Sequence, residues 1–113
     1  MPTDLDRTLA ALADPTRRAV VDQLRIRPLR SGEIAAALAM SRPAMSRHLR
    51  VLRRAGVLEE GALEGDARAR LYQLRPEPFS ELRNWLDEVE AFWGDQLDAF
   101  KAHAEGSHRK GCS

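Results

Sequence analysis

The stretch that most limits the possible folds of this chain is residues 41–56, SRPAMSRHLRVLRRAG. Its large apolar residues follow the i, i+4, i+7 spacing of a helical stripe: Met45, Leu49 and Leu52. Ser41 suits the N-cap, Pro43 fits the first turn, and Gly56 stands where a helix commonly stops. We therefore predict one amphipathic helix whose apolar side lies on a core.

The rest of this helix surface is basic and contains no acid. It carries five arginines: Arg42, Arg47, Arg50, Arg53 and Arg54. A merely solvated helix, the alternative interpretation, usually interleaves acids and bases at i, i+4. The N-terminal N–H groups and the positive dipole end of a helix also favour phosphate. We expect DNA contacts from Ser41, Arg42, Pro43, Ala44, Ser46, Arg47, His48 and Arg50.

Length and charge narrow the remaining choices. A chain of 113 residues is expected to form one domain, here residues 1–105, followed by a disordered tail at 106–113. The formal net charge is only +1, but the charge is unevenly distributed: residues 41–56 are basic, and residues 76–105 hold eight acids. The single cysteine, Cys112, excludes an internal disulfide. With neither a signal peptide nor a membrane segment in the pattern, a soluble cytoplasmic protein is expected.

The residues before the arginine-rich helix predict three shorter helices. The first covers 4–12, the second runs from the Asp14-Pro15 start to Pro28 with Ile26 on its apolar side, and the third covers 32–38 after a Ser31 cap. The third and fourth are separated by only a few residues. Two helices joined by a short turn, the second one basic, are typical of a helix-turn-helix.

Two short strands, 57–60 and 70–74, are expected next. They flank residues 61–69, which contain two glycines and read as a turn, so together they predict a hairpin. A hairpin directly after a helix-turn-helix is a wing. Arg68 and Arg70 are its candidate DNA contacts, although the wing is otherwise acidic.

Pro76 begins the last expected helix, which continues to about residue 104. Its apolar residues from Phe79 to Phe100 are spaced nearly as in a heptad seam. This helix either packs across its own domain or pairs with a second copy. For a homodimer, the predicted interface comprises Leu5, Leu9, Leu12, Leu82, Leu86, Val89, Trp93, Leu97 and Phe100.

Together these segments resemble the ArsR family of bacterial winged-helix repressors over about residues 5 to 100. The matching motifs are LADPTRR at 12–18, EIA at 33–35, SRHLRVL at 46–52, AGVL at 55–58 and RLYQL at 70–74. The resemblance implies a mainly α fold with a small β-hairpin. It further implies a dimer through the first and last helices, with each arginine-rich helix in a major groove.

The chain departs from the metal-sensing members of that family. Arg30 and Gly32 stand where such members carry two cysteines, and the last helix lacks the histidine pairs that others use. We therefore expect no metal and no cofactor, and the effector cannot be inferred. His48, His103 and His108 do not assemble a catalytic constellation with the remaining residues, so an enzyme is not expected.

Two hypotheses follow from these observations. The first is a repressor that binds double-stranded DNA. The second is a winged-helix module used only for protein assembly. The acid-free arginine face favours the repressor.

Overall fold

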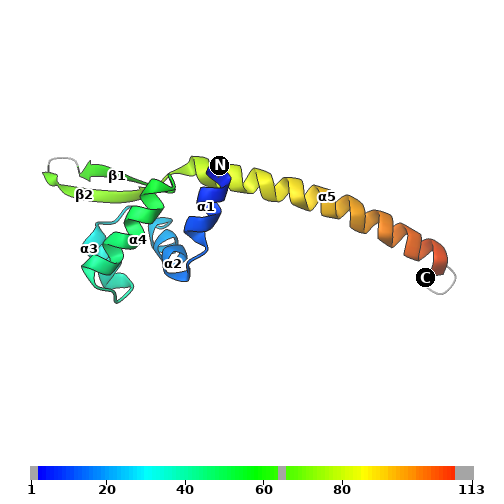
Figure 1. The fold of residues 1–113 in the computed structure, drawn as a ribbon, viewed down its shortest axis with the longest axis horizontal. Coiled ribbons are helices and arrows are strands. Elements are labelled where there is room, and N and C mark those ends of the chain that lie inside the picture. The colour runs from blue at the N-terminus through cyan, green and yellow to red at the C-terminus, as the bar shows by residue number, and fades with distance from the viewer. Residues whose placement is uncertain (1–2, 64–65, 109–113) are drawn as a thin grey trace. The chain divides into compact units, whose positions relative to one another are not determined.

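The computed structural model describes residues 3–63 and 66–108, and side chains at 62–69 and 105–108 are excluded from that description. Its elements follow in chain order (Figure 1): α1 (Asp4–Leu12), α2 (Pro15–Leu24), α3 (Ser31–Ala37), α4 (Arg42–Arg54), β1 (Leu58–Leu63), β2 (Asp66–Leu74) and α5 (Pro76–His108). The mainly α composition, the helix-turn-helix and the antiparallel hairpin confirm the predicted winged-helix fold.

The chain divides into two compact units, 1–81 and 82–113. The first contains the winged helix-turn-helix and the start of α5. The second consists, in its described part, of the remainder of α5. The predicted division into a domain at residues 1–105 and a tail at 106–113 stays a prediction. α5 continues through Gly106 to His108, and residues 109–113 lie outside the described part of the chain.

Side-chain caps start the helices largely where the sequence predicts. The Thr3 hydroxyl accepts from the Asp6 N–H at 3.2 Å, and the Asp14 carboxylate accepts from the Thr16 N–H at 2.8 Å. α3 begins one residue earlier than expected, because Glu33 reaches back to the Arg30 N–H at 2.9 Å. Each cap satisfies an N–H group that has no partner within its own helix.

The apolar stripe of α4 lies at the centre of the core, as predicted. Met45 and Leu52 are fully buried and Leu49 is 1% exposed. The other buried apolar residues come from α1, α2, α3 and β1, and from the segments that join α2 to α3 and α4 to β1. They are Ala11, Val20, Leu24, Leu29, Ile34, Ala35, Val57 and Leu58. α4 therefore contributes one side to the core and leaves the other to solvent.

Ile26 was expected on the buried side of the second helix, and that expectation is wrong. α2 ends at Leu24, and Ile26 is 76% exposed. The core position goes instead to Leu29, which exchanges two backbone hydrogen bonds with Tyr72, at 3.2 and 2.8 Å. The chain leaves the helix before Pro28 because this extended pairing with β2 replaces further helical hydrogen bonds.

The hairpin is longer than the two predicted strands. Leu58 pairs with Leu74 and Glu60 with Tyr72, and pairing continues to Leu63 opposite Asp66 with an irregularity after Ala62. Residues assigned to the turn by their glycines are therefore largely in strands. Backbone ladder bonds need no particular side chain, so pairing extends once the register is set.

In the described part of the chain, two residues adopt left-handed backbone conformations where the chain changes direction. Gly56, at φ 79°, ends α4, and its N–H donates to the Arg53 carbonyl at 3.0 Å. Ala39, at φ 53°, lies in the turn between α3 and α4. Glycine adopts this region freely, whereas an alanine there is strained. The α3–α4 turn therefore holds Ala39 in a conformation that its own side chain disfavours.

The large apolar residues of α5 are mostly uncovered beyond residue 81. The exposed ones are Trp85, Leu86, Phe92, Trp93, Leu97 and Phe100, while Leu82 and Val89 are half-buried. In α1, Leu9 is 38% exposed, and Leu5 and Leu12 are half-buried. Despite the length of α5, none of the described helices is apolar enough to cross a lipid bilayer.

Candidate nucleic-acid interface

The solvent side of α4 is organised by its buried stripe. At about 100° per residue, Pro43, Arg47 and Arg50 project roughly opposite Met45, Leu49 and Leu52. All three are exposed. Ser46 lies on the flank toward β2, where it lines a groove with Tyr72. The structure thus keeps Arg47 and Arg50 on the accessible side expected for DNA contacts.

The first turn of α4 is partly committed to structure. The Ser41 hydroxyl accepts from the Ala44 N–H at 3.3 Å, so its side chain caps the helix. The Arg42 guanidinium lies over α3, where a Cβ added to Gly32 would be 3.0 Å from Nη2. Pro43 is exposed and Ala44 is half-buried. These contacts fix the helix start that would approach a base pair.

His48 is half-buried and lies near the Asp14 carboxylate that begins α2. The backbone N–H of Arg17 is the main cause of the lowered pKa of Asp14, and the neighbouring Arg17 and His48 side chains act in the same direction. His48 therefore faces the α2 side of α4, away from the β2 side on which Ser46 lies.

In the wing, Arg70 is exposed, with its Nε 3.9 Å from the Glu60 carboxylate. Glu60 also accepts from Arg53 Nη1 at 2.7 Å. Glu59 is bound by the Gln73 side-chain amide at 2.6 Å. These acids of β1 therefore pair with neighbouring side chains. Arg68 is in β2, but its side chain lies outside the described residues.

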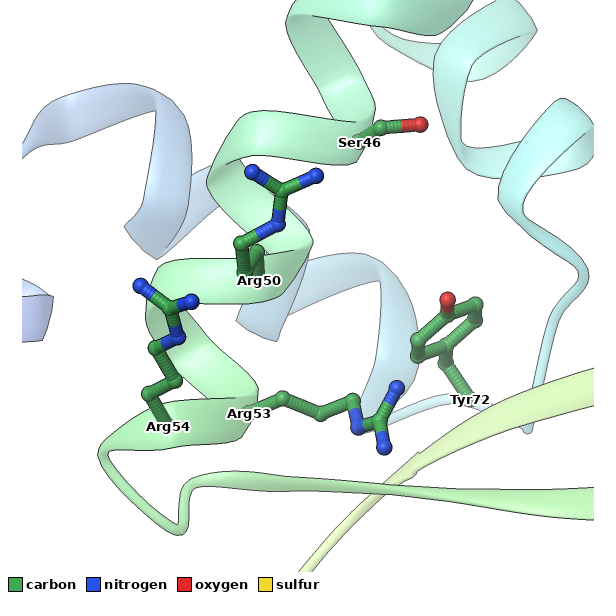
Figure 2. A pocket seen from close by; sticks show the side chains of 5 residues that line it. All are labelled: Ser46, Arg50, Arg53, Arg54 and Tyr72. Atoms are coloured by element: carbon green, nitrogen blue, oxygen red, sulfur yellow. The ribbon is translucent and has the colours of Figure 1, made fainter.

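Sequence reasoning missed a groove between α4 and β2, which has a volume of about 460 Å³. Figure 2 shows Ser46, Arg50 and Arg54 on successive turns of α4, with the Arg53 side chain reaching toward Tyr72 of β2. Arg53 follows Ser46 by seven residues, a helical spacing that could have placed both on one side. Tyr72 gave no comparable signal, because its approach to α4 depends on the hairpin register.

Arg17 and Arg18, at the start of α2, have partners within the fold. Arg17 Nε donates to the Ala11 carbonyl at 2.6 Å, and Arg18 Nη1 donates to the Leu12 carbonyl at 2.8 Å. Cations at the carbonyl end of a helix are favourable. These two arginines hold α1 against α2.

Possible metal ligands do not cluster among the described side chains. Within them, no three histidine, cysteine or carboxylate groups come close enough to hold an ion. Cys112 and the side chain of His108 fall outside the described part of the chain. The expectation of no regulatory metal therefore stays a prediction.

Comparison with known proteins gives consistent matches. Residues 12–61 match a family model described as a helix-turn-helix domain. The HTH-type transcriptional regulator Rv2034 of Mycobacterium tuberculosis is 42% identical over 95 residues, covering 84% of this chain and 83% of that protein. The transcriptional repressor SdpR of Bacillus subtilis is 34% identical over 56 residues, covering 50% of this chain and 62% of that protein.

A solved structure gives the same picture. The crystal structure of an ArsR family transcriptional regulator superposes with a TM-score of 0.72 at 32% identity. The match covers 81% of this chain and 98% of the other. The similarity therefore includes most of the chain in both sequence and backbone.

Proposed function

The chain belongs to the ArsR family of winged helix-turn-helix transcriptional regulators, and from that premise we propose that it is a repressor that binds an inverted-repeat operator as a homodimer. Each copy inserts α4 into a major groove. The family consists of transcriptional regulators, not enzymes. Repression agrees with the name of the Bacillus subtilis relative. We propose that the protein acts in the cytoplasm, where its DNA operator lies.

The observation that carries this proposal is the division of α4 into two sides. Three fully or almost fully buried apolar residues hold the helix on the core, while Arg47 and Arg50 remain exposed on the other side. Neither arginine has an acidic partner among the ion pairs between described residues. Unpaired guanidinium groups on a recognition helix suit guanine edges and phosphates.

The proposed dimer rests on the uncovered apolar residues of α5 and α1. Trp93, Leu97 and Phe100 are 57%, 60% and 71% exposed. A second copy would cover such a surface on both partners at once, because a two-fold interface is self-complementary. The two α4 helices would then be related by symmetry, so the operator half-sites should be about 34 Å apart.

The test is operator binding by Arg47→Ala and Arg50→Ala. If either arginine reads a guanine, its loss should cost about 1–3 kcal/mol and relax specificity at one base pair. Arg25→Ala is a matched control, because Arg25 is exposed at the end of α2 and its Nε lies 3.8 Å from Asp22. Native operator affinity in both α4 variants would refute the proposed role of this helix.

We propose that no metal ion bound to the folded domain controls repression. An organic ligand, a partner protein or the expression level would then regulate DNA release. Titration of Zn(II) and As(III) into the operator complex checks this. Tight, stoichiometric binding that releases DNA, and that survives deletion of residues 106–113, would contradict it.

A further inference from the structure

The groove between α4 and β2 gathers hydrogen-bond donors. Ser46, Arg50, Arg53 and Arg54 contribute from α4 and Tyr72 from β2 (Figure 2). Each guanidinium can only donate, whereas hydroxyl groups can donate or accept. Among the residues whose side chains are described, no carboxylate lines the groove. Such a donor set is complementary to an anion that has several acceptor oxygens, such as a phosphate.

Glu60, which pairs with Tyr72 across the hairpin, orders one of these donors. Its carboxylate accepts from Arg53 Nη1 at 2.7 Å, and its side chain is only 20% exposed. The same carboxylate lies 3.9 Å from Arg70 Nε. A guanidinium has five N–H donors, so the bond to Glu60 fixes Arg53 and leaves other donors available.

Tyr72 completes the groove from the wing. Figure 2 shows the Arg53 side chain reaching toward Tyr72, and the two groups are close enough for Arg53 to act on the pKa of the Tyr72 hydroxyl. Burial raises the pKa of Tyr72, the Glu60 carboxylate raises it further, and Arg53 offsets part of the change. The hydroxyl therefore stays protonated at neutral pH and keeps a hydrogen to donate.

The position of Arg53 along α4 favours backbone phosphate over a base edge. Arg53 follows the Ser41 cap by twelve residues, which at ~1.5 Å per residue is roughly 18 Å along the helix. The major groove is only about 12 Å wide. With the first turns of α4 at the bases, the last turn therefore lies near the sugar-phosphate backbone.

We propose that this groove binds one phosphate of the operator backbone through Arg53 and Tyr72, and that Glu60 acts as a positioning residue for Arg53. The inference rests on the proposed function, since it needs α4 to dock on DNA. It gives an acidic residue of the wing a supporting role in binding a polyanion. Removing Glu60 should therefore weaken binding, whereas simple charge repulsion predicts the reverse.

The experiment compares salt titrations of wild type, Arg53→Gln, Tyr72→Phe, Glu60→Ala and the control Glu59→Ala. The affinity of each protein is measured for the selected operator and for an unrelated duplex of equal length. Arg53→Gln should lose roughly tenfold in affinity on both duplexes, and the slope of log affinity against log salt should fall by about 0.9. Tyr72→Phe should weaken binding to both duplexes without changing that slope, because it removes no charge.

The sign of the Glu60→Ala effect tests the positioning role. The expected result is weaker operator binding, with Glu59→Ala equal to wild type or tighter, because Glu59 is not bonded to Arg53 in the described contacts. Glu60→Ala binding as tightly as Glu59→Ala would overturn that role. An unchanged salt slope in Arg53→Gln would overturn the phosphate contact.

A chemical control works even if Glu60→Ala fails to fold. Operators carrying one neutral methylphosphonate at successive positions are bound to wild type and to Arg53→Gln. At one position per half-site, the methylphosphonate should remove the difference between the two proteins, and a constant difference at every position would overturn the inference. Failure of wild type to bind any operator would overturn the proposed function as well, whereas native binding by all variants overturns the phosphate site alone.

Discussion

Truncating Trp93 should weaken the proposed homodimer, and the exposed fraction of the Trp93 side chain sets the size of the increase in the dissociation constant. Trp93 is 57% exposed in a single chain. Complete burial of a large apolar side chain is worth about 3 kcal/mol at the upper end, so covering the exposed share contributes roughly 1–2 kcal/mol per copy. Trp93→Ala removes this from both copies. We therefore expect the dimer dissociation constant to rise roughly 30-fold to nearly 1,000-fold.

Sedimentation over a concentration series measures the dissociation constant directly. Asp95→Ala is the matched control: Asp95 is exposed on the same helix, and two residues along α5 place it about 200° around the axis from Trp93. Replacing both Val89 and Trp93 by glutamate should abolish the dimer and operator binding together while α4 is unaltered. A Trp93→Ala dissociation constant within threefold of wild type would refute the reasoning.

Three further predictions concern the winged-helix unit. Leu49→Ala should lower the free energy of unfolding by about 2–5 kcal/mol in a urea titration, because Leu49 is 1% exposed; a loss below 1 kcal/mol would contradict its core position. Ala39→Gly should raise the free energy of unfolding by up to about 1 kcal/mol, because it removes the strain of an alanine in the left-handed region at φ 53°. The control Ala36→Gly, in an exposed helical position, should cost up to about 1 kcal/mol, and equal losses in both variants would contradict this. Asp14→Asn keeps a capping side chain but removes a carboxylate whose pKa is lowered chiefly by the Arg17 N–H. The variant should have a lower free energy of unfolding than wild type at neutral pH, and this difference should disappear as acid protonates wild-type Asp14. A difference that persists in acid would contradict a stabilising role for the Asp14 charge.

The elements predicted with good boundaries were those whose ends carry local chemical signals. Asp14 and Ser41 cap α2 and α4 as expected, since a cap is an interaction between residues two or three apart. The buried stripe of α4 was equally readable, because helical periodicity determines which side chains share a face. Local spacing was therefore sufficient for the helix-turn-helix and for the exposed position of Arg47.

The features that were missed depend on contacts between distant residues. Ile26 lost its expected buried place because Leu29 pairs with Tyr72, forty-three residues later. The groove beside α4 needs the same register, which brings Tyr72 and Glu60 next to Arg53. A cross-strand register is not visible in the periodicity of a single segment, so neither the role of Glu60 nor that of Tyr72 could be inferred from sequence.

Selection of bound fragments from genomic DNA by the purified protein tests the central claim most directly. The account predicts enrichment of fragments that share an inverted repeat with half-sites about one helical turn, roughly 34 Å, apart. The enriched sites should lose affinity steeply as salt rises. Recovery of fragments with no common sequence, or of isolated half-sites without a symmetric partner, would contradict a dimeric, sequence-specific repressor.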